Sequence, residues 1–183
     1  MNPAQGGLLI APPGLPDPRF KKTVMLITRN NKAGSLALCV NRITQYTVKD
    51  VLADTGLNLD LNIPLYWGGP VDVTSIWMLH SSEWQLDSTM HINDDWSITS
   101  NISMFHHISD LDTPKYFRLM FGQASWAPGQ LTAELRGMPP WNPNHSWLLA
   151  DEITPEWLFE QPEDSLWVNC TEMSGLQAVS HWL

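Results

Sequence analysis

Residues 115–135 read KYFRLMFGQASWAPGQLTAEL, and this stretch decides the fold that the sequence predicts. Side chains alternate in character over residues 116–121, and a period of two is typical of a β-strand. We expect Gly122 to end that strand at a corner. Pro128 suits the first position of a helix, because its missing N–H would have no intrahelical partner there. Gly137 and the prolines after it end the helix. The stretch therefore predicts a strand, a corner and a short helix.

The corner brings three side chains with binding chemistry to one end of this unit: Trp126, Gln130 and Glu134. Backbone N–H groups at the start of the helix are also free there. The corner is therefore a candidate binding surface. A packing corner is the competing interpretation, because tryptophan and turn glycines more often build structure than sites.

Composition indicates a single globular domain over residues 1–183, long enough to bury a core. Hydrophobic residues make up 43% of the chain and charged residues 16%, which excludes an intrinsically disordered protein. The chain has ten tryptophans, whose large side chains usually need a partner for the indole N–H. They predict a core or a pocket rich in tryptophan.

The net charge is −9 at pH 7 and is unevenly distributed. Basic residues prevail over residues 1–50, whereas acids prevail over residues 134–183. An acidic chain is repelled by nucleic-acid phosphates, and the basic residues form no tight run. We therefore expect no direct nucleic-acid binding, and we interpret the acidic part as a solvated face.

Two cysteines, Cys39 and Cys170, are too few and too far apart to form a disulfide framework. We expect both to be inert core thiols in a reducing cytoplasm. No stretch of 18 apolar residues is present, and no charged leader followed by an apolar run opens the sequence, so we expect neither a membrane span nor export.

Short strands joined by turns dominate the first hundred residues. A hairpin is predicted, with strands over residues 23–28 and 35–41 and a turn between them. The other predicted strands cover residues 7–11, 64–67, 76–80, 90–92, 96–99 and 146–150. Gly68 and Gly69 predict a tight turn between strands; the alternative, a phosphate-binding loop, would need a helix directly after it.

Helices are predicted mainly from their first residues. Thr47 and Asp50 resemble a capping box for a helix that stops near Gly56. Asn101 is expected to cap a helix through residue 108, and Thr154 to cap a short one that begins with proline. A last helix is expected to open at residue 164 or 165.

His80 is the single residue most suggestive of catalysis or ligand binding, because it ends an apolar strand. A hydrogen-bonded structural histidine is the commoner case. The neighbours His106 and His107 point to different faces, so the sequence predicts no metal site. No cofactor-binding motif is evident either, and we expect no cofactor.

Several of these segments resemble the AlgH/YqgE family of bacterial proteins, whose hallmark is a glycine–tryptophan–proline stretch followed by a short Ser-Trp-Leu strand. The matching residues are Gly7, Leu9, Ala11, Pro13, Asp17, Pro18, Phe20, Val40, Asn41, Gly68, Gly69, Pro70, Val71, Leu79, His80, Gly122, Trp126, Pro128, Gly129, Gln130, Leu131, Glu134, Leu135, Ser146, Trp147 and Leu148. The resemblance implies an α+β fold: a mixed, largely antiparallel sheet, partly closed into a small barrel, with surrounding helices.

Two functional hypotheses follow. One is a non-enzymatic cytoplasmic binding or regulatory protein, with a protein or small molecule as its partner. The resemblance implies an indirect regulator of transcription, since members are labelled regulators of exopolysaccharide (alginate) synthesis. The other is a small enzyme of unknown class, with a pocket near Asn41, Gly68–Gly69 and Trp126–Gln130. The candidate pocket residues are Asn41, Gly68, Gly69, Pro70, His80, Trp126, Gln130 and Glu134. A pure interaction module, recognisable by an exposed tryptophan patch, is a third possibility.

Overall fold

The computed structural model of this chain describes residues 3–142 and 146–180. The strands are β1 (Leu8–Ile10), β2 (Val24–Asn31), β3 (Gly34–Cys39), β4 (Ile43–Thr47), β5 (Pro64–Trp67), β6 (Val71–Ser81), β7 (Thr89–His91), β8 (Trp96–Thr99), β9 (Phe117–Trp126) and β10 (Leu148–Ala150). The α-helices are α1 (Val48–Leu52), α2 (Ser103–Ser109), α3 (Gln130–Leu135), α4 (Pro155–Glu160) and α5 (Glu163–Ser180). Among the described residues, Pro18–Phe20 and Ala53–Thr55 form 3₁₀ helices.

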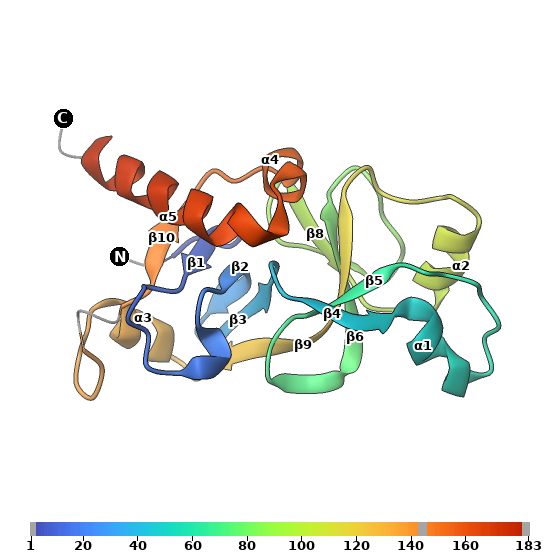
Figure 1. Cartoon of the computed structure of the whole chain (residues 1–183), viewed down its shortest axis with the longest axis horizontal. Helices are drawn as coiled ribbons and strands as arrows, with labels where there is room; N and C mark the ends of the chain where they lie inside the picture. The colour runs from blue at the N-terminus through green and yellow to red at the C-terminus, as the bar shows by residue number, and fades with distance from the viewer. Residues whose placement is uncertain (1–2, 143–145, 181–183) are drawn as a thin grey trace.

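The strands form one curled sheet, a half-barrel, with the order β10-β1-β2-β3-β9-β6-β8-β7 and with β4 and β5 attached beside β9. Among the strands that the structure describes, every pair is antiparallel except β5 with β9. Figure 1 shows α5 lying along the β1–β2 side and α1 and α2 together at the opposite end. The expected α+β fold, with a mixed, largely antiparallel and partly closed sheet, is confirmed.

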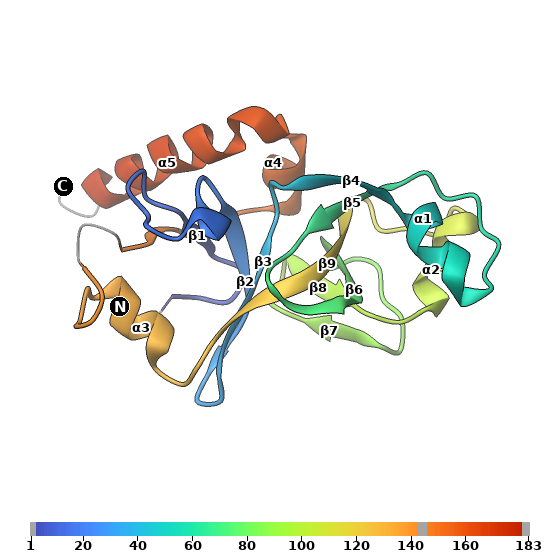
Figure 2. The same ribbon diagram turned by 60° about the horizontal axis from the view of Figure 1, so that its bottom comes forward.

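β9 is the strand that joins the two halves of the sheet (Figure 2). Its first half lies between β5 and β6, and its last residues pair with β3. The expectation that Gly122 ends this strand is wrong, since β9 continues to Trp126. Gly122 instead adopts φ +71° in mid-strand, where the register with β6 shifts, so it forms an irregularity that bends the strand without ending it.

The Gly68–Gly69 turn crosses over β9. As predicted, it connects two strands, β5 and β6, and no helix follows it. These two strands lie on opposite sides of β9. A Cβ atom on Gly69 would lie 2.1 Å from the backbone carbon of Gln123, and one on Gly122 would lie 2.2 Å from the carbonyl oxygen of Gly69. The glycines therefore permit two backbones to touch, and the two glycine-rich bends meet in space.

Local signals in the sequence give several elements correctly. The 23–41 hairpin forms as β2 and β3, and the capping box of Thr47 and Asp50 is present. Thr154 caps α4, which begins at Pro155. The strand β4 was not predicted, and the last helix begins at Glu163, slightly earlier than expected.

Two helix starts differ from the prediction. α3 begins at Gln130, because Gly129 adopts a left-handed φ of +78° and a turn separates Pro128 from the helix. Pro128 therefore lies outside the helix. α2 begins at Ser103 and its N-cap residue is Ile102, not Asn101. The side chain of Asn101 nevertheless accepts a hydrogen bond from the backbone N–H of Ser103.

Three buried clusters hold the elements together. The largest packs β1, β2 and β3 against α4 and α5, and a second packs α1 and α2 against β5, β6 and β9. The third surrounds Trp126 and Trp147 and underlies the site described below. Among the described helices, none has both the length and the apolar character needed to cross a membrane.

Candidate functional site

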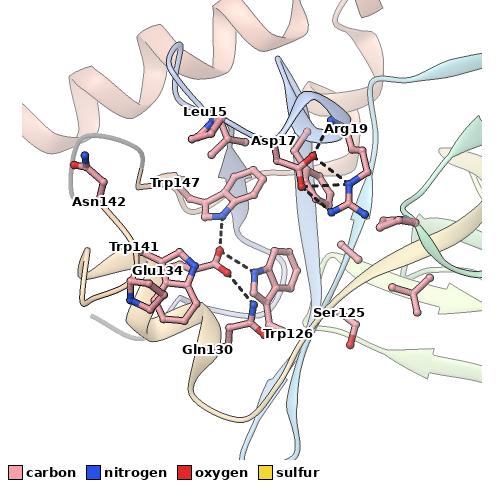
Figure 3. A pocket seen from close by; sticks show the side chains of 16 residues that line it. Leu15, Asp17, Arg19, Ser125, Trp126, Gln130, Glu134, Trp141, Asn142 and Trp147 are labelled. Atoms are coloured by element: carbon pink, nitrogen blue, oxygen red, sulfur yellow. Dashed lines mark hydrogen bonds and ion pairs between the residues drawn. The ribbon is translucent and has the colours of Figure 1, made fainter.

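A cavity of about 540 Å³ opens beside the corner at the end of β9. Its walls come from the loop after β1, the start of β6, the end of β9, α3 and the chain on either side of residues 143–145. The lining residues are Leu15, Pro16, Asp17, Arg19, Phe20, Pro70, Val71, Ala124, Ser125, Trp126, Gln130, Glu134, Pro140, Trp141, Asn142 and Trp147. Figure 3 shows the lining side chains, with Trp126, Trp147 and Gln130 directed at the carboxylate of Glu134.

Glu134 is held by three neutral hydrogen-bond donors. Its Oε2 atom accepts from the indole N–H groups of Trp126 and Trp147, each at 3.1 Å. Its Oε1 atom accepts from the side-chain amide of Gln130 at 3.0 Å. Gln130 is itself fixed, because its own carbonyl oxygen accepts from the backbone N–H of Ala127. The carboxylate thus has a fixed orientation, and two buried indoles have their acceptor.

The helical spacing of α3 produces this arrangement. Gln130 and Glu134 are four residues apart and lie on one face of α3, one turn above the other. Two tryptophans approach that face from separate parts of the chain. Trp126 is the last residue of β9, and Trp147 immediately precedes β10.

The aromatic rings of the site pack edge to face. The Trp126 and Trp147 rings are 6.2 Å apart at 81°, and Phe20 packs against Trp147 at 5.9 Å and 76°. Phe20 also contacts Trp67, at 6.1 Å. Such pairs are favourable beyond the area they bury, so the floor of the cavity is a rigid aromatic cluster.

The rim of the cavity carries a close ion pair. The guanidinium of Arg19 donates to both carboxylate oxygens of Asp17, with a shortest distance of 2.7 Å. These hydrogen bonds hold the pKa of the Asp17 carboxyl below its usual range. Asp17 also caps the 3₁₀ helix that begins at Pro18, because its carboxylate accepts from the backbone N–H of Arg19, and so it shapes one wall of the cavity.

Asn41 and Arg42 hold the backbone of residues 19–22, next to that wall, by hydrogen bonds. The Asn41 amide donates to the carbonyl of Lys22 and its oxygen accepts from Val24 N–H. Arg42 donates to the carbonyls of Arg19 and Lys21 and stacks over Trp67, 5.0 Å from the ring centre. Asn41 is therefore a positioning residue, and it does not line the cavity.

The eight residues predicted for a pocket separate into two groups. Pro70, Trp126, Gln130 and Glu134 line the cavity together, whereas Asn41, Gly68, Gly69 and His80 do not. The two glycines are buried in the crossing over β9.

His80 is fully buried, with its ring nitrogens within 2.9 Å of the Ser81 carbonyl and the Thr99 hydroxyl. It stacks edge-on against Trp84. Burial lowers its pKa. Within residues 3–142 and 146–180, no group of three or more His, Cys, Asp or Glu side chains is arranged to hold a metal ion.

Several lining residues were not predicted as part of a site. In the sequence, Asp17, Phe20 and Trp147 are only points of family resemblance, and no pattern points to Arg19 or Trp141. Asp17, Arg19 and Phe20 are more than a hundred residues from α3 in sequence, and the pairing of β1 with β2 and β10 brings them there. Trp147 lies within a short Ser-Trp-Leu segment, and this was the one local signal that pointed to it.

Comparisons with known proteins agree with this architecture. The model of a family described as AlgH-like matches residues 8–179. A UPF0301 protein of Nitrosospira multiformis is 33% identical over 85% of this chain and 82% of its own length, and one of Idiomarina loihiensis is 32% identical over 96% and 93%.

Two solved structures are similar in fold. The AlgH protein from Pseudomonas aeruginosa superimposes with a TM-score of 0.75 at 25% identity and covers 96% of this chain and 92% of its own. Protein DIP2367 from Corynebacterium diphtheriae has a TM-score of 0.71 at 21% identity, covers 93% and 86%, and supports the fold alone. With a family match that spans almost the whole chain and relatives above 30% identity, this protein belongs to the AlgH-like family.

Proposed function

We propose that this chain is a non-enzymatic binding protein and that the cavity beside Glu134 is its ligand site. The observation that carries the proposal is a cavity of about 540 Å³ with aromatic walls and one fixed carboxylate. Small-molecule sites are commonly of this size, mostly apolar, and supplied with a few oriented polar groups. Because Glu134 is already held by three donors, a ligand would meet a preorganised group.

Binding is favoured over catalysis by the placement of the polar side chains. The enzyme hypothesis used Asn41, His80, Gln130 and Glu134 together, and only the last two line the cavity. General acid–base chemistry needs groups within hydrogen-bond reach of one reacting atom. Asn41 and His80 instead bond to the backbone and hydroxyl groups around them.

We also propose a regulatory role in the cytoplasm that operates through a bound ligand or protein and not through DNA. The two buried free thiols, Cys39 and Cys170, support a reducing compartment. The net charge of −9 supports an indirect route, because DNA phosphates repel such a chain. Tight, salt-sensitive and sequence-specific DNA binding in a gel-shift assay would contradict the indirect route.

A thermal-shift screen of the purified chain against a metabolite library tests the binding proposal. A ligand present at 100 times its Kd stabilises the native state by about 2.7 kcal/mol. For a chain of this size that corresponds to a rise in Tm of about 5–10 °C.

Leu15→Trp provides the site control, because Leu15 is half-buried, lines the cavity and packs against the aromatic cluster, so a larger ring there would occupy the space. We expect the variant to fold normally and to lose the shift. The proposal is contradicted if no compound in the library raises Tm, or if a ligand raises the Tm of Leu15→Trp as much as that of the wild type.

A further inference from the structure

The charged groups around the cavity leave one negative charge without a cationic partner. Asp17 and Arg19 pair with each other at 2.7 Å, so their charges cancel locally. Glu134 forms no ion pair with any Lys or Arg that the structure describes. Among the residues that the structure describes, its side-chain partners are three neutral indole and amide groups. A partly buried carboxylate in this state attracts a positive charge.

Glu134 also has hydrogen-bonding capacity to spare. A carboxylate offers about four lone-pair positions, two on each oxygen. Oε2 uses two of them for Trp126 and Trp147, and Oε1 uses one for Gln130. One acceptor position on Oε1 is therefore left for a donor from the ligand. A charged N–H group would form the stronger, charge-assisted bond there.

The walls favour the same chemistry. Trp126, Trp141, Trp147 and Phe20 all line the cavity, and the faces of aromatic rings attract cations. Trp126 and Trp147 direct their N–H edges toward Glu134 (Figure 3), so their N–H groups are not free to serve an anionic ligand. The net charge of −9 also raises the local concentration of cations.

From these observations we infer that the cavity binds an organic cation, a primary ammonium or guanidinium group attached to an apolar or aromatic body. The charged nitrogen donates to Oε1 of Glu134, and the body packs against Phe20 and the tryptophans. This inference rests on the proposed function, because it names the ligand class of the same cavity.

Three probes that share a phenyl ring test the charge preference: benzylammonium, benzyl alcohol and benzoate. Binding is followed at pH 7 through the indole N–H resonances of Trp126 and Trp147, which report on the bonds to Glu134. We expect benzylammonium to bind at least about tenfold more tightly than benzyl alcohol, and benzoate to bind least. The three probes are compared on the wild-type protein, so this test does not depend on the folding of any variant.

Glu134→Gln tests the carboxylate, because a Gln carbonyl can still accept from both indoles while the charge is removed. We expect the preference for benzylammonium over benzyl alcohol to fall to within about twofold. Glu172→Gln is the matched control, since it removes the same charge from an exposed position on α5. We expect Glu172→Gln to keep the wild-type preference.

The outcomes separate the two proposals. If benzyl alcohol or benzoate binds as tightly as benzylammonium, or if Glu134→Gln keeps the preference, the cation class is wrong and the binding function stands. The same holds if the library yields neutral or anionic ligands while benzylammonium is silent, or if Glu172→Gln and Glu134→Gln lose the preference equally. Silence of all three probes and of the whole library overturns both.

Discussion

Gly122→Ala tests whether the crossing of the Gly68–Gly69 turn over β9 stabilises the fold. The new Cβ would lie 2.2 Å from the carbonyl oxygen of Gly69, a backbone atom that has no rotamer with which to move away. A non-glycine residue at the observed φ of +71° costs about 1–2 kcal/mol. Forcing the two backbones apart adds about 1–3 kcal/mol, the usual cost of overpacking. The sum is about 2–5 kcal/mol, a large part of the stability of a typical domain.

Urea unfolding, followed by tryptophan fluorescence and by circular dichroism, measures this loss. In a thermal melt, Tm should fall by about 4–20 °C. Gly129→Ala is the matched control, because Gly129 has a similar φ of +78° and no heavy atom within 4 Å of an added Cβ. It should lose only the conformational part, about 1–2 kcal/mol. If the two variants lose equal stability, the close backbone contact contributes nothing and the reasoning is refuted.

Three further predictions concern buried and capping groups. Burial lowers the pKa of His80 below 6.5, so the stability that its neutral form contributes is complete above pH 6.5 and is lost as the pH falls through the lowered pKa. In urea unfolding, His80→Gln should therefore flatten the fall of stability below pH 6.5, and an unchanged pH dependence would contradict this. Burial raises the pKa of Cys39 to about 11 and of Cys170 to about 12, so neither thiol should react with a disulfide reagent at pH 8 until urea unfolds the chain, and rapid native labelling would contradict this. Asp50→Ala should cost about 1 kcal/mol in urea unfolding, because it removes one side of the capping box with Thr47; an unchanged midpoint would contradict this.

The elements predicted correctly are those whose causes are local. The hairpin of β2 and β3 follows from two apolar runs and the turn residues between them. The start of α1 follows from Thr47 and Asp50, and the start of α4 from Thr154 and Pro155. In each case, residues within four positions of one another supply the hydrogen bonds or the dihedral angle, so the sequence alone is sufficient.

Gly122 shows where this local reasoning fails. A glycine after six alternating residues is consistent with either a strand end or an irregularity inside a strand. The choice depends on β3, which pairs with Ala124 and Ser125 and so extends β9 beyond the glycine. It depends also on Gly69, whose backbone occupies the space that a side chain would need. Both partners are more than fifty residues away, and no pattern within β9 encodes them.

The candidate site divides in the same way. Gln130 and Glu134 share one face of α3, and Trp126 immediately precedes the corner, so their proximity was predictable from spacing. Asp17 and Arg19 reach the same cavity through the pairing of β1 with β2 and β10. His80 was suggestive only because the sequence does not show that Thr99, on the adjacent strand β8, already bonds to its ring.

The crossing of the Gly68–Gly69 turn over β9 also positions two walls of the cavity. Pro70, which lines the cavity, directly follows the two glycines that touch β9, and Trp126 ends the same strand four residues after Gly122. The separation between these two walls is therefore set by the contact of Gly69 with β9. A substitution that pushes the Gly68–Gly69 turn away from β9 must also move Pro70 away from Trp126. A folded Gly122→Ala variant should therefore bind benzylammonium more weakly than wild type. Gly175→Ala on the exposed side of α5 leaves both walls in place and should bind it normally. Equal affinity in the two variants would show that the walls of the cavity are held apart by other contacts.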